Sequence, residues 1–329
     1  MQEGILRARL LVGLALSLAA CVVPASASDF PNRPMEIVVP FPPGGNTDLL
    51  ARLLADGLQR ELKQPVAVLN KPGAGTNIGA AFVANGKPDG YTMLISAPAS
   101  FVVNQFLYPS LSYDPDTSFS PVSLVAQFPN VLVVHPSLGV NSIQELIAKA
   151  KAEPGKISFA SAGIGTTSHL AGMQFAEMAN INVLHVPYKG TSQSLQDLIT
   201  GRVGYTIDNL GPILPFIQSK QLIAIGVSTA EPVSLLPGVP PISTVLPGYS
   251  LSSWNVLAAP AGTPKDVVEI LSKASDKVLH TPEVMEKARS FGSEVVGGTP
   301  ESVARFLKEE RVRWEAAVKA AKLDKNTFR

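Results

Sequence analysis

Two stretches of the sequence combine glycine, hydroxyl and small polar residues at the same spacing, 120 positions apart. Residues 45–51 read Gly-Asn-Thr-Asp-Leu-Leu-Ala, and residues 165–171 read Gly-Thr-Thr-Ser-His-Leu-Ala. Each stretch follows an apolar, strand-like run, which indicates that a strand, a loop and a helix start occur twice. Glycines let backbone N–H groups approach a ligand, and the first turn of a helix offers unpaired N–H donors at the positive end of its dipole. Two such loops facing each other predict a cleft that binds an anion, most simply a carboxylate.

The elements that must position these loops follow an α/β pattern. Short apolar runs alternate with amphipathic stretches, which predicts sheets covered by helices on both faces. The expected strands are residues 36–40, 66–69, 92–96, 131–134, 156–160, 183–186, 203–207 and 223–227. The expected helices are residues 49–62, 143–152, 170–179, 195–201, 265–279 and 301–321. Thr263-Pro264 and Thr299-Pro300 each predict an N-cap followed by a first-turn proline at the start of the last two helices.

The N-terminus has the pattern of a secretory signal peptide covering residues 1–27. Arg7 and Arg9 precede an apolar run over residues 10–20, which is shorter than the ~20 residues that a membrane-spanning helix needs. Ala25-Ser26-Ala27 fits cleavage before Ser28, and this interpretation is preferred because small residues stand at the required positions. Leu18-Ala19-Ala20-Cys21 has the form of a lipoprotein box and is the competing site. The mature protein is expected to be soluble and exported.

Composition excludes several classes of function. The formal net charge is +1 and charged residues make up 16% of the chain, so neither a nucleic-acid footprint nor a polybasic membrane patch is present in the sequence. Cys21 is the only cysteine, so a chain cleaved after Ala27 has no disulfide, no catalytic thiolate and no cysteine metal site. A small molecule or another protein is therefore the expected partner, and no metal or cofactor is expected.

About 300 mature residues are more than one core usually holds, which predicts two domains. The repeated unit recurs in mid-chain, while the C-terminal region is helical and lacks a third copy. The expected division is a discontinuous first lobe, residues 28–128 and 256–329, and a second lobe, residues 129–255. Two extended crossings, near residues 127–130 and 254–258, would form a hinge.

An ordered set of motifs resembles the Bug family of periplasmic solute receptors of tripartite tricarboxylate transporters. The resemblance covers essentially the whole mature chain. The motifs are Pro31-x-Arg33-Pro34, Ile37-Val38-Val39-Pro40-Phe41, Gly44-Gly45-x-x-Asp48, Asn70-Lys71-Pro72-Gly73-Ala74-Gly75, Pro88-Asp89-Gly90-Tyr91-Thr92, Ser161-x-Gly163-x-Gly165, His185-Val186-Pro187-Tyr188-Lys189-Gly190, the Trp254 segment and Ala259-Pro260-Ala261-Gly262-Thr263-Pro264.

The resemblance implies a two-lobed fold of the type II periplasmic binding-protein kind, with a ligand cleft between two doubly wound sheets. It also implies a small organic acid as ligand, namely a carboxylate, dicarboxylate, acidic amino acid or aromatic acid. The membrane subunits of the transporter are the implied protein partner, the periplasm is the implied location, and a monomer is the expected state. The two cleft loops contain no Lys or Arg, as is frequent in this family.

The first-lobe candidates for ligand binding follow from the family's first two ligand loops. They are Phe41, Gly44, Gly45, Asn46, Thr47, Asp48, Thr76 and Asn77. Gly45, Asn46 and Thr47 would offer N–H groups or water-bridged contacts, and Phe41 an apolar wall. Alternatively, Asn46 or Thr47 only caps the next helix, and Asp48 only favours its positive end. The stretch 73–79 is not a dinucleotide fingerprint, because Ile78 stands where the third glycine should fall.

The second-lobe candidates are Ser161, Gly165, Thr166, Thr167, His169, Tyr188 and Asp208. Hydroxyl and N–H groups at 161–167 would hold a carboxylate directly, or would cap the helix without touching a ligand. His169 is interpreted mainly as a packing or hydrogen-bonding residue, and Tyr188 as a wall of the cleft. If Asp208 faces the cleft, it favours a ligand with an ammonium or hydroxyl donor; otherwise it is a turn residue.

A periplasmic hydrolase and a ligand-sensing binding protein are the two alternatives to a transport receptor. A periplasmic hydrolase of small carboxylate derivatives needs a nucleophile and a base, but no Gly-x-Ser-x-Gly or His-Glu-x-x-His motif occurs and the histidines are scattered along the sequence. No catalytic residue is therefore assigned and the chain is not expected to be an enzyme. A binding protein that signals to a sensor kinase is the closer alternative, and the sequence does not separate it from a transport receptor.

Overall fold

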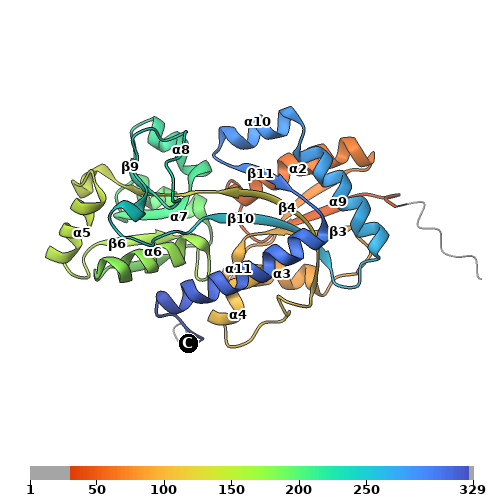
Figure 1. The fold of residues 1–329 in the computed structure, drawn as a ribbon, viewed down its shortest axis with the longest axis horizontal. Helices are drawn as coiled ribbons and strands as arrows, with labels where there is room; N and C mark the ends of the chain where they lie inside the picture. Colours follow the sequence, from red (N-terminus) through yellow and green to blue (C-terminus); the bar gives the residue numbers. More distant parts are fainter. Residues whose placement is uncertain (1–29, 326–329) are drawn as a thin grey trace, which may run out of the picture. The chain divides into compact units, whose positions relative to one another are not determined.

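Two β-sheets organise the part of the chain that this computed structural model describes, residues 30–325 (Figure 1). All the elements below belong to one compact unit, which begins at Arg33. The signal-peptide prediction and Cys21 lie outside the described residues. Within the described residues, no helix is both long and apolar enough to cross a bilayer.

The strands and helices expected from the sequence are all present, with ends displaced by a few residues. The strands are β1 (Met35–Val39), β2 (Val66–Asn70), β3 (Thr92–Ser96), β4 (Phe119–Phe128), β5 (Asn130–Val134), β6 (Ser158–Ser161), β7 (Leu184–Pro187), β8 (Tyr205–Asn209), β9 (Ile223–Val227), β10 (Ser253–Pro260) and β11 (Glu294–Gly297). The α-helices are α2 (Asn46–Leu62), α3 (Asn77–Ala84), α4 (Asn104–Leu107), α5 (Ile143–Ala152), α6 (Thr167–Ala179), α7 (Thr191–Ile199), α8 (Leu210–Gln218), α9 (Lys265–Leu279), α10 (Pro282–Ser290) and α11 (Pro300–Ala320). Sequence patterning did not predict the strands β4, β10 and β11 or the helices α3, α4, α8 and α10.

The two sheets repeat one topology. The first has the order β2-β1-β3-β10-β4-β11 and the second the order β7-β6-β8-β5-β9. In each sheet the first three strands are parallel, and the next two pair antiparallel to their neighbours. The carboxyl ends of β1 and β6 therefore occupy equivalent places in their sheets. Each strand has the next parallel strand of the chain on one side and a later parallel strand on the other, so the chain changes direction across the sheet at this point. In open α/β sheets this is where ligands bind.

The sequences of the central elements explain their places. Met35, Ile37, Val38 and Val39 of β1 are fully buried, as expected for a strand covered on both faces. Helix α2 buries Leu50, Leu54 and Leu58, which recur every four residues and so share one face. This burial fixes the helix against its sheet and fixes the direction in which its N-terminus points.

The chain passes between the two sheets twice, and the passages are hydrogen-bonded to each other. Pro129 alone separates β4 from β5, and residues 228–252 separate β9 from β10. Asn130 N–H donates to Ser228 Oγ (3.0 Å), and the Asn130 side chain donates to the Leu251 carbonyl (3.2 Å). Pro129 falls within one expected crossing, residues 127–130, whereas the other, residues 254–258, lies inside β10, as does the predicted lobe boundary between residues 255 and 256. The lobe boundaries remain a prediction.

Helix α11 packs on β4 of the first sheet and on α6, which belongs to the second (Figure 1). Its buried carboxylate, Glu310, accepts hydrogen bonds from the indole N–H groups of Trp254 (2.6 Å) and Trp314 (2.8 Å). Trp254 lies on β10, so this three-residue contact joins the helix to the strand on which the chain returns to the first sheet.

One predicted helix cap is confirmed and one is wrong. Thr299 caps α11 by accepting from Ser302 N–H (3.3 Å), with Pro300 in the first turn. Thr263 does not cap α9, because the helix begins one residue later and Pro264 itself occupies the cap position. The Thr263 hydroxyl instead donates to the Pro260 carbonyl (2.8 Å) and closes the turn after β10.

Candidate functional site

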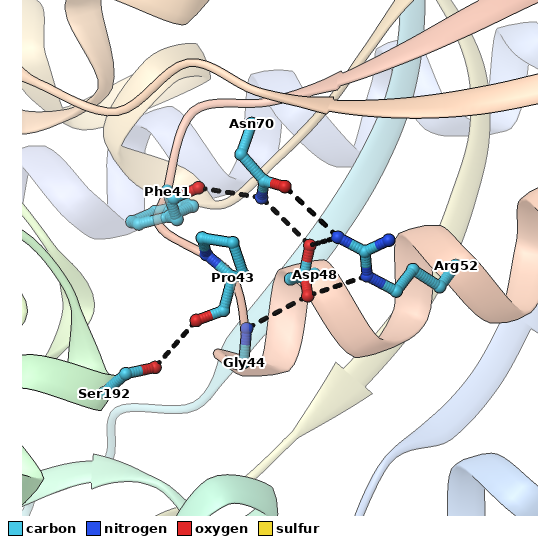
Figure 2. A network of polar contacts seen from close by, with 7 residues as sticks. All are labelled: Phe41, Pro43, Gly44, Asp48, Arg52, Asn70 and Ser192. Atoms are coloured by element: carbon cyan, nitrogen blue, oxygen red, sulfur yellow. Dashed lines mark hydrogen bonds and ion pairs between the residues drawn. The ribbon is translucent and has the colours of Figure 1, made fainter.

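The first ligand loop, residues 40–45, joins β1 to α2 and is held by the carboxylate of Asp48. Asp48 Oδ2 accepts the Gly44 N–H (3.0 Å), and its two oxygens accept two N–H groups of Arg52 at 3.0 Å (Figure 2). Asn70, at the end of β2, donates to Asp48 Oδ1 (2.9 Å) and to the Phe41 carbonyl (3.0 Å). Burial alone would raise the pKa of Asp48, but the hydrogen bonds from Arg52, Gly44 and Asn70 outweigh it and the pKa lies below its ordinary value. Asp48 therefore holds the loop in place through these hydrogen bonds and does not line the inner cavity itself.

The first turn of α2 lacks a side-chain cap. Gly45 is its N-cap residue, and no side chain accepts a first-turn N–H group. Asn46 and Thr47 are inside the helix, and both are buried: the Asn46 side chain donates to Ser293 Oγ (3.2 Å), and Thr47 Oγ1 accepts from Asn255 (3.1 Å). The alternative in which Asn46 or Thr47 caps this helix does not describe the structure. The first-turn N–H groups have no acceptor within the helix and point to the end where β1 stops.

The second loop, residues 162–166, joins β6 to α6 and is held by neutral groups. Thr166 is the N-cap and its hydroxyl accepts from His169 N–H (3.4 Å). Ser168 Oγ accepts the Ala162 N–H (2.9 Å), and His169 Nδ1 accepts the Gly165 N–H (3.3 Å). Gly165 has φ +83°, and a Cβ there would collide with the Asn104 side chain of the other lobe. The glycine thus allows both the turn and the close approach of the two lobes.

A column of buried rings stands behind the second loop. The rings of His169 and His185 stack with centroids 4.4 Å apart, and Phe159 stacks on His185 at 4.7 Å. Burial lowers the pKa of His169 to about 3, with a further contribution from His185, and burial lowers the pKa of His185 to about 4. Both rings are therefore neutral at pH 7.

His185 Nε2 lies 2.7 Å from Ser161 Oγ, a pairing that sequence reasoning missed because the two residues are 24 positions apart. A serine hydroxyl beside a neutral imidazole is the beginning of a nucleophile-and-base pair. However, Ser161 is fully buried, and it accepts the Gly163 N–H (3.2 Å). The signal that could have found the pairing is the register of two adjacent parallel strands, because Ser161 pairs with Pro187 and His185 with Phe159.

An inner cavity of about 30 Å³ lies between the two loops. Seven of the predicted residues line it: Phe41, Gly45, Asn46, Thr47, Thr166, Thr167 and Asp208. The lining residues that were not predicted are Pro42, Ala97, Ala162, Ser168, Gly190, Thr191, Asn209 and Ser253. Ala97, Gly190, Thr191 and Asn209 lie at or just after the carboxyl ends of β3, β7 and β8, so those strand ends were the signal that could have found these four residues. No Lys, Arg or His is among the described residues that line this cavity.

An outer cavity of about 200 Å³ adjoins the inner one and shares Phe41, Ala162 and Thr166 with it. Thr76 and Tyr188, two more predicted residues, line the outer cavity. Its other walls include Pro40, the 73–75 turn, Tyr108, Gly163, Ile164, Pro187 and Lys189. Hydrogen bonds from the Tyr188 hydroxyl to Asp197 (2.7 Å) fix the position of that ring, and burial with the Asp197 contact raises the pKa of Tyr188 to about 12.

The remaining predicted residues line neither of the two cavities. Gly44, Asp48, Ser161, Gly165 and His169 shape the loops through the hydrogen bonds described above. Asn77 accepts from the side chains of Asn104 (2.6 Å) and Tyr113 (3.1 Å), and so holds the turn that carries Thr76.

Asp208, at the end of β8, is almost completely buried (1% exposed). Its Oδ2 accepts from the Thr191 hydroxyl (2.9 Å) and its Oδ1 from the Asn209 N–H (2.7 Å). Burial raises its pKa to about 6, and those two hydrogen bonds limit the rise. It is the one ionisable group among the described residues that line the inner cavity.

Two hydrogen bonds join helices that pack on the second sheet to the first loop and to a strand of the first sheet. Ser192 of α7 donates to the Pro43 carbonyl (2.9 Å; Figure 2), and Thr167 Oγ1 lies 3.1 Å from Ser253 Oγ on β10. Residues of both repeated loops line the inner cavity. That this cavity binds the ligand stays a prediction.

Comparison with known proteins agrees with this architecture. The model of the tripartite tricarboxylate transporter family receptor (TctC) matches residues 50–323. The chain belongs to this family of solute-binding receptors. The BugT protein of Bordetella pertussis is 35% identical to this receptor over 310 residues, covering 94% of this chain and 95% of BugT.

Solved structures resemble this TctC-family receptor along almost its whole length. An R. palustris protein solved with adipate superposes with a TM-score of 0.88 at 37% identity, covering 90% of this chain and 99% of that one. MatC from Rhodopseudomonas palustris, solved with bound malate, gives a TM-score of 0.84 at 30% identity, covering 88% of this chain and 100% of MatC. The two-lobed fold expected from the sequence is thereby confirmed, and so is the relationship to the Bug proteins.

Proposed function

We propose that this receptor captures a small organic acid between its lobes outside the cytoplasm and delivers it to the membrane subunits of a tripartite tricarboxylate transporter. The observation that carries the proposal is the meeting of two helix N-termini, those of α2 and α6, at one cavity that no Lys or Arg of the described chain lines. Backbone N–H groups and hydroxyls are then the available partners for an anion.

Each lobe contributes one set of donors. Gly45, Asn46 and Thr47 surround the uncapped start of α2, and Thr166 and Thr167 surround the start of α6. A carboxylate accepting from both helices holds the lobes together, because each oxygen is shared between lobes. Hydrogen bonds to a charged group contribute about 1.5–3 kcal/mol each, so a few such contacts are enough to favour the closed arrangement.

The sizes of the cavities limit how a ligand fits. The inner cavity, about 30 Å³, holds roughly two water-sized groups, so it takes the head group of an acid and little more. The rest of the molecule extends into the outer cavity, past Phe41 and toward Thr76 and Tyr188. Relatives solved with adipate and with malate support a carboxylate head group.

Capture is reversible and proceeds by lobe closure about the two crossing passages. The lobes are residues 28–128 with 256–329, and residues 129–255. A signal peptide cleaved near Ala27 places the mature monomer in the periplasm, with lipid attachment at Cys21 as the less favoured alternative. The buried Ser161–His185 pair supports the loop and has no catalytic role in this proposal.

A thermal-shift screen of the mature protein tests the proposal. The panel contains mono-, di- and tricarboxylates, acidic amino acids and aromatic acids, and selective binding to the folded state raises the melting temperature. A shift for a subset of these acids is expected. A flat response across the whole panel, confirmed by titration calorimetry, would contradict the anion cleft.

The acid found in that screen then tests the assignment of the second loop. Thr167→Ala should weaken its binding by about 1–2 kcal/mol, because the hydroxyl borders the cavity and a charged hydrogen bond is lost. Thr200→Ala, on the exposed end of α7, is the matched control and should bind normally. Equal affinities for the two variants would remove Thr167 from the site.

A further inference from the structure

The inner cavity has an acceptor side as well as a donor side. Asp208 lines it and is 1% exposed, yet each of its carboxylate oxygens has one protein donor, Thr191 on Oδ2 and Asn209 N–H on Oδ1. A carboxylate has about four lone-pair sites, so acceptor capacity is left over. Among the described residues that line the cavity, no cation balances this group.

Two amide oxygens lie near the same strand end, because Asn209 is the last residue of β8 and Asn46 Oδ1 lies beside Gly211, two residues further along the chain. Asn46 Oδ1 and Asn209 Oδ1 are buried without a hydrogen-bond partner, and both residues line the inner cavity. A buried acceptor without a donor is rare in a folded protein and is expected where a ligand supplies the donor. Three acceptor groups around one small cavity are an unsuitable surface for an anion alone, because a carboxylate placed against them would be repelled.

The donors lie at the starts of α2 and α6, and the acceptors gather around the end of β8. A ligand with a carboxylate and a protonated nitrogen close together would satisfy both sides at once. Its carboxylate would take the helix N–H groups, and its ammonium would take Asp208 and the two amide oxygens. With a plain carboxylate in the same arrangement, the buried carboxylate of Asp208 lies near a second negative charge with no cation beside it, which is costly.

We propose that the receptor selects aminocarboxylates, and that Asp208 is the residue that determines this specificity by accepting a hydrogen bond from the protonated amine of the ligand. This inference rests on the proposed function and narrows its ligand class. The side chain of the aminocarboxylate extends into the outer cavity, where Tyr108, Ile164 and Tyr188 form much of the wall.

Matched pairs of ligands test the selection on the unaltered protein. Titration calorimetry compares L-glutamate with glutarate, L-aspartate with succinate, and L-phenylalanine with 3-phenylpropionate, each pair differing by the amino group. In at least one pair the amino compound should bind about tenfold tighter or more, the effect of one charge-assisted hydrogen bond. Plain acids that bind as tightly as their amino partners would overturn the inference and leave the proposed function standing. If no organic acid of any class binds, the proposed function itself fails.

The Asp208→Asn variant tests the residue. It keeps the size of the side chain and its partners can still pair with an amide, so the cavity is retained. The preference for the amino compound should fall about tenfold or more, and binding of the plain acid should hold or improve. Asp266→Asn, an exposed carboxylate in the first turn of α9, is the matched control and should keep the wild-type preference. An unchanged preference in Asp208→Asn would refute the assignment, and the wild-type ligand pairs decide the selection even if this variant does not fold.

The pH dependence separates an ammonium partner from a shared proton. If Asp208 accepts from an ammonium, affinity for the amino compound falls as the pH is lowered from 7.5 to 5, because the carboxylate becomes protonated. If a protonated Asp208 instead donates to a plain carboxylate, affinity for that acid rises over the same range, and this second result would overturn the inference.

Discussion

The first ligand loop, between β1 and α2, is held from behind by a charged group, whereas the second, between β6 and α6, is held by neutral ones. Asp48, with Arg52 and Asn70, fixes the first loop (Figure 2). Ser168 and the His169–His185 stack fix the second. The repeated strand, loop and helix therefore conserve the position of the backbone donors while the supporting side chains differ. In both loops a side chain accepts a hydrogen bond from a loop N–H group. A carboxylate does this in the first loop, and a hydroxyl and an imidazole do it in the second.

The difference predicts that the first loop depends most strongly on one residue. Asp48→Ala should lower the free energy of unfolding by about 2–4 kcal/mol, because it leaves the Gly44 N–H and Arg52 without their buried acceptor. Urea denaturation followed by circular dichroism measures the loss. The control is Glu269→Ala, which breaks an exposed pair with Lys273 (3.4 Å) and should change stability by less than about 1 kcal/mol. Equal effects would mean that the Asp48 network is no more important than a surface pair.

The two loops should also differ in their response to acid. The lowered pKa values of His169 and His185, about 3 and about 4, mean that their contribution to stability is complete above the unfolded value of 6.5. It is lost as the pH falls from 6.5 toward those folded values. Asp48 has a pKa below its ordinary 3.8, so its contribution stays constant between pH 7 and pH 5.

Unfolding measured from pH 7 to pH 4.5 for wild type and His185→Gln checks this difference. The free-energy difference between them should shrink as the pH falls, whereas the difference between wild type and Asp48→Ala should stay flat above pH 5. Asp208 acts in the opposite sense, since its raised pKa of about 6 makes its contribution grow as the pH falls. The contribution of Asp208 is the same in wild type and in both variants, so it cancels when their unfolding free energies are subtracted. A His185→Gln difference that does not vary with pH would contradict the neutral-imidazole support.

Within the second loop, the Ser168 hydroxyl should contribute less than the Asp48 carboxylate does in the first. Ser168→Ala leaves the buried Ala162 N–H without its acceptor at 2.9 Å, and about 1–2 kcal/mol of unfolding free energy should be lost. Ser290→Ala, at the exposed end of α10, is the control and should be near neutral. A loss as large as that of Asp48→Ala would show that the two supports are equivalent in strength.

The smallest effect is expected where the loops meet across the cleft. Ser192→Ala removes the exposed hydrogen bond to the Pro43 carbonyl (2.9 Å). Ligand affinity should fall by less than about fivefold, the value of one partly solvated hydrogen bond, with stability of the free protein unchanged. Calorimetry with the acid identified by screening measures the change, and Ser219→Ala, on the exposed end of α8, serves as control. A larger loss would mean that this contact, and not the bound acid, holds the lobes closed.

The sequence predicts those parts of the fold and site that depend on local pattern. The apolar runs of β1 and β6, and the glycine and hydroxyl residues after them, predict the loops because strand and helix periods and the demands of a tight turn are local properties. Asp208 was a candidate because of the resemblance to the family, at a position directly after the predicted strand of residues 203–207.

Contacts between distant segments could not be predicted in this way. Ser253 reaches the cavity because β10 inserts beside β3, and Ser161 meets His185 because β6 and β7 pair in register. Those facts depend on strand order, which a single sequence does not contain. Asp48 illustrates a third case: its place in the motif was predicted, but its role as the anchor of the loop required Asn70 from the next strand.

The shared hydrogen bonds of Glu310 have an optical consequence. The chain has two tryptophans, Trp254 and Trp314, and both indoles donate to this one carboxylate at the junction of β10 and α11. Ser253, the residue before Trp254, lines the inner cavity and contacts Thr167 across the cleft. The tryptophan fluorescence of the unlabelled protein therefore originates at a single place, next to a residue that lines the inner cavity. Its emission wavelength and quenching should report opening and closing in real time, with no dye attached.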